Sequence, residues 1–329
     1  MRDVLTDVNA WLRDHETVAL ATVVSTWGSA PRPAGSRMAV SRSGRLSGSV
    51  SGGCLEGDVF EHAQAVLKGG PARLHHYGVS DDLAWTVGLS CGGEVDILVE
   101  PLTDVHRSLM EALTAERPVV LASALTEPAG ARRLVAADEP EALSLLDRET
   151  PERRDGWFFE PFPRPAELVI FGGAHVAIPL SRFAQDLGFR VTVVDARSKF
   201  ADKERFPAAA QVIHAWPDDA LEHMAIDRSS YLVVLTHDPK FDDPTIRAAL
   251  KKNARYIGAI GSRKTHAERV ARLVASGVPK TDLERVHAPI GLDLGAKTAE
   301  ETALAILAEM VAVRHNRRGG AMAGASPAG

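Results

Sequence analysis

The two cysteines of the chain both lie in glycine-rich segments of its first half. Cys54 stands in SGSVSGGCLEGD and Cys91 in LSCGGEVDI, each beside a glycine pair that lets backbone amides approach a ligand closely. Cys54 also precedes a predicted helix, whose dipole favours a thiolate and therefore soft-metal or sulfur chemistry. A functional thiol and an inert buried cysteine are both open interpretations at each position.

Two glutamates, Glu56 and Glu94, lie close to these cysteines in the sequence and are candidate acids or bases. A plain surface carboxylate is the alternative for each. No CxxC pair, HExxH pattern or comparable spacing occurs in the sequence. We therefore expect neither a disulfide framework nor a metal site built from protein ligands alone.

In the second half, an apolar strand runs directly into a glycine turn, FGGAHVA. Gly172, Gly173, Ala174 and His175 form a degenerate GxGxxA pattern that opens a helix, and amides at a helix N-terminus attract anions. Asp195 ends the next strand, where a carboxylate can accept hydrogen bonds from ribose hydroxyls. The pattern predicts a site for a nucleotide-type phosphate. The alternative is a βαβ unit without a ligand, which the Cβ of Ala174 favours.

Polar and glycine residues also follow two later strands: Thr236, His237, Asp238, Gly261, Ser262, Arg263 and Lys264. Ligands of parallel sheets bind at such strand ends. We expect Ser262 to cap a helix, and the amides and cationic side chains of Arg263 and Lys264 to form a second anion site. Ordinary helix capping with solvated charges is the alternative.

These residues must be positioned by two kinds of domain. In the first half, few helices separate the strand candidates, which indicates an α+β domain. The expected helices are 1–14, 55–67 and 105–115, and the expected strands are 17–26, 36–41, 45–51, 95–100 and 118–124.

The second half alternates strands with helices, a pattern typical of a Rossmann-like, doubly wound parallel sheet covered on both faces. The expected strands are 168–171, 190–195, 211–214, 231–236 and 255–259, and the expected helices are 175–187, 244–253, 263–275 and 299–315. Thr298 and Glu301 form a capping box at the start of the last helix.

Three prolines between Pro161 and Pro165 predict a stiff connector, so we expect an N-terminal domain at 1–160 and a Rossmann-like domain at 161–316. Residues 317–329 are mostly small and polar, which predicts a disordered tail. The 38 basic and 43 acidic residues give no basic surface for nucleic acid. No apolar run reaches membrane-spanning length and no export signal opens the chain, so we expect a cytoplasmic protein.

Taken together and in order, these segments resemble the XdhC/CoxI family of xanthine dehydrogenase accessory proteins. The resemblance covers about residues 17–314 and rests on GSAPRPAGSRM, SGSVSGGCLEGDV, SCGGEV, FGGAHVA, VVDARSKF, ERFP, THDPKFDD, YIGAIGSRKT and HAPIGLDLGAKTAEETALAILAEM. The residues that match the family's glycine-and-histidine turn, its DxR and its two cysteines are Gly172, Gly173, His175, Asp195, Arg197, Cys54 and Cys91. Ala174 and Ala299 depart from a common glycine and a common proline.

The resemblance implies a cytosolic maturation factor for a molybdenum hydroxylase of the xanthine or carbon monoxide dehydrogenase type, and not a turnover enzyme. Such a protein binds molybdenum cofactor, as molybdopterin or its cytosine dinucleotide, supports its sulfuration through a cysteine desulfurase, and delivers it to the apoenzyme. Cys54, Cys91, Glu56 and Glu94 are then candidate contacts for sulfur or molybdenum. A homodimer is a further hypothesis.

On this view the two domains face each other across a cleft, with the pterin phosphate or its nucleotide on the Rossmann half and molybdenum near the cysteines. A cytosine dinucleotide would suit Asp195 best. Two alternatives stay open. One is an NAD(P)-dependent oxidoreductase, for which His237 and Asp238 are the candidate acid and base. The other is a non-catalytic nucleotide-binding interaction module.

Overall fold

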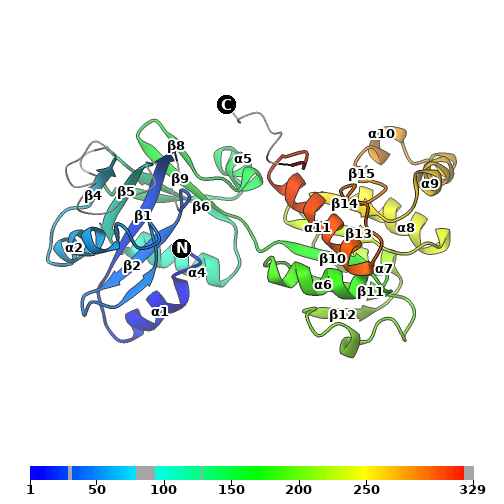
Figure 1. Ribbon diagram of the computed structural model, residues 1–329, viewed down its shortest axis with the longest axis horizontal. Coiled ribbons are helices and arrows are strands. Elements are labelled where there is room, and N and C mark those ends of the chain that lie inside the picture. Colours follow the sequence, from blue (N-terminus) through cyan, green and yellow to red (C-terminus); the bar gives the residue numbers. More distant parts are fainter. Residues whose placement is uncertain (29–31, 79–92, 127–128, 322–329) are drawn as a thin grey trace. The chain divides into compact units, whose positions relative to one another are not determined.

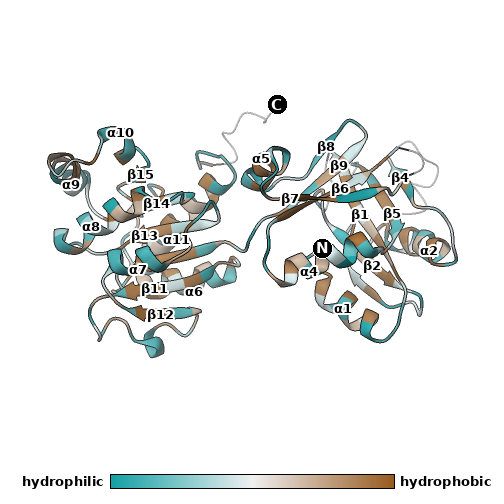
Figure 2. Cartoon of the chain, turned by 180° about the vertical axis from the view of Figure 1, so that it is seen from behind, coloured by the Kyte–Doolittle hydropathy of each residue, from teal (hydrophilic) through white to brown (hydrophobic). Residues whose placement is uncertain are grey.

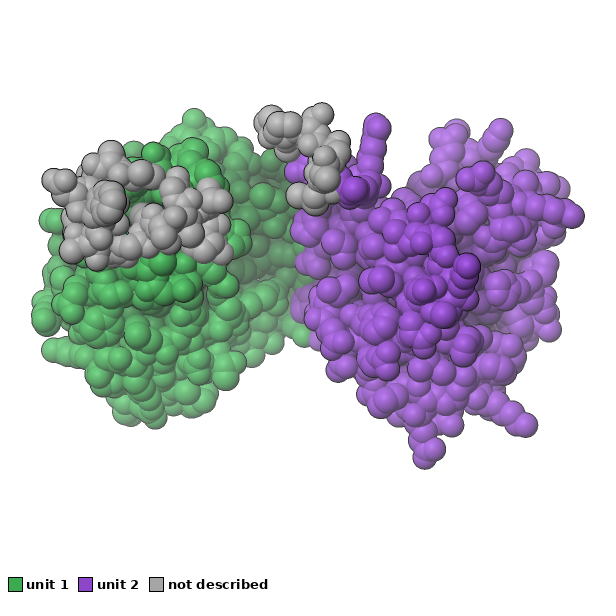
Figure 3. Space-filling model, viewed as in Figure 1, with its two compact units in different colours: residues 1–164 green, residues 165–329 purple. Residues whose placement is uncertain are grey.

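The computed structural model describes residues 1–28, 32–78, 93–126 and 129–321, and the chain divides into two compact units, Met1–Arg164 and Pro165–Gly329 (Figure 3). Each unit has hydrophobic cores of its own and is described by itself. Within the described ranges, no helix combines the length and the apolar character needed to cross a membrane.

Unit 1 contains two antiparallel sheets (Figure 1). The five-stranded sheet has the order β3-β2-β1-β5-β4, and the four-stranded sheet has the order β7-β6-β9-β8. The strands are β1 (Val18–Trp27), β2 (Arg37–Ser41), β3 (Leu46–Gly48), β4 (Arg73–Tyr77), β5 (Glu94–Pro101), β6 (Val119–Ala124), β7 (Arg132–Ala136), β8 (Glu152–Arg154) and β9 (Trp157–Phe162).

Strand β1 is buried on both faces because helices cover both sides of its sheet. The helices of unit 1 are α1 (Leu5–Arg13), α2 (Glu56–Leu67), α4 (Asp104–Thr114) and α5 (Pro140–Arg148). Successive side chains of a strand point to opposite faces. Leu20 accordingly packs in the cluster of α1 and α4, whereas its neighbours Ala19 and Ala21 pack in the cluster of α2.

Unit 2 is a six-stranded parallel sheet in the order β12-β11-β10-β13-β14-β15. Its strands are β10 (Glu167–Phe171), β11 (Arg190–Asp195), β12 (Gln211–His214), β13 (Ser230–Val234), β14 (Tyr256–Ala259) and β15 (Val286–His287). The strand order reverses between β10 and β13. In doubly wound sheets this switch point is where ligands bind, beyond the carboxyl ends of the strands.

Helices cover both faces of this sheet. They are α6 (Ala177–Asp186), α7 (Pro217–His223), α8 (Pro239–Leu250), α9 (Arg263–Ala275), α10 (Lys280–Leu283) and α11 (Ala299–Arg314), with a 3₁₀ turn η1 (Lys203–Arg205). Helices α6 and α11 share one core with the sheet, and α7, α8 and α9 share the other. Because both faces are covered, β10 reads as an almost continuous apolar run, as its hydropathy shows (Figure 2).

The connector between the units begins later than the prolines predict, because Pro161 and Phe162 belong to β9 and pair with β6. Pro161 cannot donate a hydrogen bond, yet it fits there because β8 pairs only as far as Phe159 and leaves one side of β9 without a neighbour. Prolines are tolerated in a strand where the amide faces no partner.

Several predicted elements have limits that differ from the structure, and for two of them the difference has a clear physical cause. The helix expected from Pro244 begins at Pro239, because Asp238 caps it by accepting from the Lys240 amide at 3.1 Å and proline is preorganised for the first helical position. The strand expected over 45–51 is only Leu46–Gly48, since the residues after it turn toward Glu56. The predicted tail lies partly outside the described residues, from 322 onward.

Candidate functional site

The two glycines of the first turn in unit 2 are packed so closely that a side chain would not fit at either. Gly172 has a φ of +104°, and a Cβ added to it would lie 2.7 Å from Cγ2 of Thr236, at the end of the neighbouring strand. A Cβ on Gly173 would lie 2.4 Å from the Phe200 carbonyl oxygen. The turn is therefore held between the ends of β11 and β13, at the switch point of the sheet.

The helix that follows this turn begins without a side-chain cap. Its first residue is Ala177, and Val176 at the capping position makes no side-chain hydrogen bond to it. Ala174 is half-buried and accepts the Ala177 amide at 3.1 Å, and His175 is exposed. The Ala177 amide is therefore taken and Pro179 has no amide hydrogen, so within the first three residues of α6 only the Ile178 amide has no partner among the described residues. A free amide at a helix N-terminus favours an anion, and the phosphate site at this turn stays a prediction.

Asp195 lies at the end of β11, and its carboxylate accepts hydrogen bonds from two residues, Gly173 and Arg197. Its Oδ2 accepts from the Gly173 amide and from Arg197 Nη2, both at 2.8 Å. Its Oδ1 accepts from the amide and the Nε of Arg197, both at 2.9 Å. Burial would raise the pKa of this carboxyl, but the hydrogen bonds from Arg197 and Gly173 hold its pKa below the ordinary value. A carboxylate has about four acceptor positions, and all four positions of Asp195 are occupied by these hydrogen bonds. None is left for the hydroxyl groups of a ribose.

Thr236 connects this turn to a buried ion pair that the sequence patterns do not single out. Its hydroxyl donates to Oδ1 of Asp242, whose Oδ2 accepts from Arg269 Nη2 at 2.8 Å. Arg269 also donates to the Ile260 carbonyl at 2.9 Å. Asp242 and Arg269 are 2% and 1% exposed. A continuous set of contacts therefore joins α9, α8 and the end of β13 to Gly172.

One sequence signal could have found this pair. Arg269 stands one helical turn before the buried Leu273 on α9, where an apolar residue is expected. Asp242 is part of THDPKFDD, whose first residue is Thr236. An arginine on an apolar helix face and a carboxylate in a strand-end motif together indicate a buried pair.

The second predicted anion site has the geometry of ordinary helix capping. Ser262 caps α9 as expected, accepting the Thr265 amide at 3.1 Å, and Gly261 before it has a φ of +143°. Arg263 and Lys264 are exposed. An anion at this turn stays a prediction.

The remaining strand-end residues also have local partners or face solvent. Asp238 caps α8 and forms an ion pair with Lys240 at 3.3 Å. Hydrogen bonds from Lys240 lower the pKa of Asp238. His237 is exposed beside it. The roles of His237 and Asp238 as an acid and a base stay predictions.

In unit 1, the loop that carries Cys54 folds around the carboxylate of Glu56. Oε1 of Glu56 accepts from Ser49 Oγ at 2.6 Å and from the amides of residues 50, 51 and 52 at 3.2, 2.9 and 3.1 Å. Oε2 accepts from the Gly53 amide at 2.8 Å and from the Ser51 hydroxyl. Burial opposes ionisation, but these donors lower the pKa of Glu56 to about 2. Glu56 thus orders the loop and has no free acceptor position.

Cys54 follows directly on this ordered loop and is a free, partly buried thiol. The preceding glycines, Gly52 and Gly53, have φ values of +78° and +123°, which are strained for any other residue. Glu94 is exposed at the start of β5. Cys91 lies outside the described residues. The structure therefore places Cys54 directly after the loop that the Glu56 carboxylate orders, and it leaves the predicted role of Cys91 untested.

Two polar clusters include residues of β4, one with α2 and the other with β1, β5 and β8. In one, Tyr77 and His62 contact Asp58 at 2.7 and 3.2 Å, and the His62 ring stacks on His75 at 3.8 Å. Burial, followed by the neighbouring His62, lowers the pKa of His75 to about 4. In the other, Asp96 contacts Ser25, His76 and Arg153 at 2.8, 2.8 and 2.6 Å. Within the ranges described, no group of His, Cys, Asp or Glu is arranged to hold a metal.

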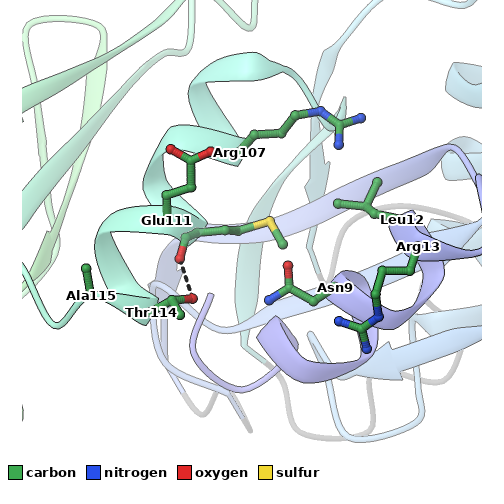
Figure 4. Close-up of a pocket in the computed structure, with 8 residues that line it drawn as sticks. Asn9, Leu12, Arg13, Arg107, Glu111, Thr114 and Ala115 are labelled. Carbon is green, nitrogen blue, oxygen red and sulfur yellow. Dashed lines mark hydrogen bonds between the residues drawn. The ribbon is translucent and has the colours of Figure 1, made fainter.

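A cavity of about 540 Å³ lies between α1 and α4 of unit 1 (Figure 4). Its lining is Asn9, Leu12, Arg13, Arg107, Met110, Glu111, Thr114 and Ala115. The Thr114 hydroxyl donates to the Met110 carbonyl at 2.8 Å. The cavity has no thiol and no glycine turn in its lining, and none of the residues singled out in the sequence contributes to it.

Relatives cover nearly the whole chain. Residues 168–310 match the XdhC Rossmann domain, and residues 11–78 match the XdhC and CoxI family. A Bacillus subtilis protein, named as a probable subunit of xanthine dehydrogenase, is 31% identical over 326 residues, covering 94% of this chain and 97% of the relative. The molybdenum cofactor insertion chaperone PaoD of Escherichia coli is 29% identical, with 92% and 85% covered.

A solved structure has the same fold. It is described as a xanthine dehydrogenase from Bacillus halodurans, and it matches with a TM-score of 0.72 and 27% identity over 98% of each chain. The Rossmann order of unit 2, the glycine turn at its switch point and the relatives along both units lead to one assignment. The chain belongs to the XdhC and CoxI family.

Proposed function

We propose that this protein binds molybdenum cofactor, supports its sulfuration, and inserts it into a molybdenum hydroxylase of the xanthine or carbon monoxide dehydrogenase type. Family membership and the relative named as an insertion chaperone support this role. The observation that carries it is the turn at Gly172 and Gly173, which keeps the close packing of a phosphate-binding turn at the switch point. We place the protein in the cytoplasm, where its client would be assembled.

The residues that would hold the cofactor through its phosphate are those of the turn, Gly172 to His175, with the Ile178 amide in the first turn of α6. Thr236 supports the turn from β13, and the Gly173 amide is committed to Asp195. When bound, the cofactor supplies the molybdenum centre that the client enzyme needs. The chain's part is to orient the phosphate end. In unit 1, Cys54 is the thiol available for a sulfur-handling role.

Retention of the cofactor by the purified protein tests the binding step. Cofactor released from a molybdoenzyme is mixed with the protein without oxygen, and the gel-filtered protein is assayed for molybdenum and pterin. We expect molybdenum and pterin to co-elute with the protein. Absence of both from the protein fraction would overturn the proposal.

A glycine substitution locates the site. In Gly172→Ala the new Cβ meets Thr236, so we expect retention to fall about tenfold or more. Gly188→Ala is the matched control, because Gly188 also has positive φ, +81°, but a Cβ there has no neighbour within 4 Å. Thermal unfolding of both variants separates lost binding from lost fold. Equal retention by the two variants would contradict a site at this turn.

Sulfuration and delivery need a partner assay. Cofactor-loaded protein is incubated with an apo molybdenum hydroxylase, a cysteine desulfurase, L-cysteine as the sulfur source and a thiol reductant, and hydroxylase activity is followed. We expect activity to depend on the loaded protein and to fall with Cys54→Ser. Normal delivery by Cys54→Ser would remove the thiol from the proposal and leave cofactor binding intact.

The Rossmann strand order favours one second candidate, an NAD(P)-dependent oxidoreductase. Quenching of NADPH or NADH fluorescence by the protein, together with substrate-dependent oxidation of the nucleotide, would support it. The filled acceptor positions of Asp195 argue against a ribose-reading site of that kind.

A further inference from the structure

Asp195 is the residue from which a ribose-reading Rossmann site would recognise its nucleotide, and its carboxylate has no acceptor position to spare. Two donors reach each oxygen, one bond from the Gly173 amide and three from Arg197. The residue is 3% exposed. A ribose diol could bind here only by displacing a charge-assisted pair, which costs more than a neutral hydrogen bond returns.

Arg197 is held in place on two sides. Its Nε and Nη2 bind Asp195, and its guanidinium lies 4.0 Å from the centre of the Phe200 ring. Its Nη1 has no hydrogen-bond partner among the described residues, and the side chain is 44% exposed. A fixed, partly exposed guanidinium is a preorganised donor for an anion.

Lys199 and Arg205 belong to the same loop, as does Lys203, whose ammonium group donates to the Ala209 carbonyl. The Arg205 guanidinium also lies over Phe200, at 5.0 Å, and its Nη1 donates to the Lys199 carbonyl at 3.3 Å. Neither Lys199 nor Arg205 forms an ion pair within the described part of the chain. We call Arg197, Lys199, Phe200 and Arg205 the cation cluster.

The carboxylates around the cation cluster are occupied locally. Asp202 caps η1 by accepting the Glu204 amide at 2.9 Å. Asp238 forms an ion pair with Lys240, and its negative charge also acts on the Arg197 guanidinium. Glu204 is exposed on η1. These acids reduce the positive field without taking up the cations of the cluster.

The loop that carries the cation cluster packs against the phosphate turn. The carbonyl of Phe200 occupies the position that a Cβ on Gly173 would need, 2.4 Å away, and the Phe206 ring is also in contact with that position. The Asp195–Gly173 hydrogen bond joins the same two segments from the other side. The loop that carries the three cations of the cluster is therefore packed against the turn that a phosphate would reach.

We propose that the cation cluster is a subsite for a phosphomonoester, so that unit 2 takes the cofactor form that ends in one, molybdopterin, in preference to its cytosine dinucleotide. This rests on the proposed function. A phosphomonoester carries nearly two negative charges at neutral pH and three acceptor oxygens, which suits guanidinium and ammonium donors. The dinucleotide lacks a phosphomonoester, and its ribose diol meets an Asp195 that is already saturated.

The test uses small probes without molybdenum. Methyl phosphate is a monoester, dimethyl phosphate is the matching diester with a single charge, and cytidine carries the ribose diol alone. Binding to the full chain is measured by titration calorimetry and ³¹P NMR at a pH above the second phosphate pKa. We expect methyl phosphate to bind at least about tenfold more tightly than either of the others. No detectable binding of methyl phosphate, or equal or tighter binding of dimethyl phosphate or cytidine, would overturn the subsite.

Variants assign the binding to the cluster. We expect Arg205→Ala and Lys199→Ala, which leave the Asp195 pair intact, each to weaken methyl phosphate several-fold, and Arg197→Lys to weaken it by losing the planar fork. Arg182→Ala is the matched control, since Arg182 is an exposed arginine over another ring, Phe183, at 5.0 Å. Unchanged binding in all three cluster variants would overturn the assignment.

This result and the cofactor result are independent. Cofactor retention without selective binding of methyl phosphate overturns only the subsite. Selective binding of methyl phosphate without cofactor retention overturns the proposed function and keeps the anion subsite.

Discussion

Several residues that could contact a ligand instead interact with neighbours inside the protein, and these interactions are not evident from the sequence. Glu56 and Asp195 both stand where an acid could face a ligand, yet each carboxylate is surrounded by donors from its own neighbourhood. Gly172 and Gly173 are needed because atoms of residues 235 and 236, just after β13, and of Phe200 and Phe206 fill the space of a Cβ. The types of these four residues are therefore explained by the local structure that they stabilise, before any contact with a ligand is considered.

Replacing Glu56 by glutamine tests the order of the Cys54 loop. The amide group puts N–H donors against the loop donors that now point at a carboxylate, so we expect a loss of about 1–3 kcal/mol in unfolding free energy. We also expect faster alkylation of Cys54 by iodoacetamide. Glu61→Gln, on an exposed position of the same helix, is the charge-matched control. An alkylation rate equal to that of wild type would show that Glu56 does not order the thiol loop.

At the scale of elements, the buried Asp242–Arg269 pair holds α8 and α9 to the ends of β13 and β14. Arg269→Met leaves a buried carboxylate without its cation, and we expect it to cost about 3–5 kcal/mol. The double variant Arg269→Met with Asp242→Leu removes the stranded charge and should recover much of this loss. Urea unfolding of the three proteins measures the difference. A double variant less stable than Arg269→Met would contradict this account.

The contact between β4 and α2 makes part of the stability pH-dependent. The folded pKa of His75 is about 4 and its unfolded value is 6.5, so the unfolded chain binds more protons between these limits. The stabilisation is complete above about pH 6.5 and is lost as the pH falls toward 4. Allowing for partial exposure, we expect a loss of about 1–2 kcal/mol.

The measurement compares urea midpoints across this pH range in wild type and His75→Gln. The variant should lose less stability than wild type on acidification. His223→Gln, at an exposed histidine of α7, should follow the wild-type profile. Parallel profiles for wild type and His75→Gln would remove His75 as the source.

Much of the fold is predictable from pattern, and the limits of the prediction have physical causes. The alternation in the second half gives the parallel sheet because both faces must be apolar, as β10 and β13 are. The pattern misplaces the start of α8 because Pro244 resembles a first-turn proline, whereas Asp238 and Pro239 already supply cap and start. The turn and Asp195 are predictable from spacing. The saturation of Asp195 is not, because it depends on where Arg197 folds back.

At the scale of the whole molecule, the chain has two compact units with separate cores. We expect calorimetry to resolve two unfolding transitions, because neither core includes residues of the other unit. Cofactor binding should raise the transition of unit 2, since a ligand stabilises the unit that holds it. A single transition that shifts as a whole would contradict independent cores.

The contacts that run from Arg269 through Asp242 and Thr236 to Gly172 have a consequence for genetics. A random mutant library screened for an inactive client would return substitutions in α8 and α9 alongside those in the glycine turn. Their phenotype would look like a ligand-contact defect, although these side chains are buried beneath the strand ends. Second-site mutations that restore function to an Arg269 mutant should then arise at Asp242, which would show that the two positions depend on each other.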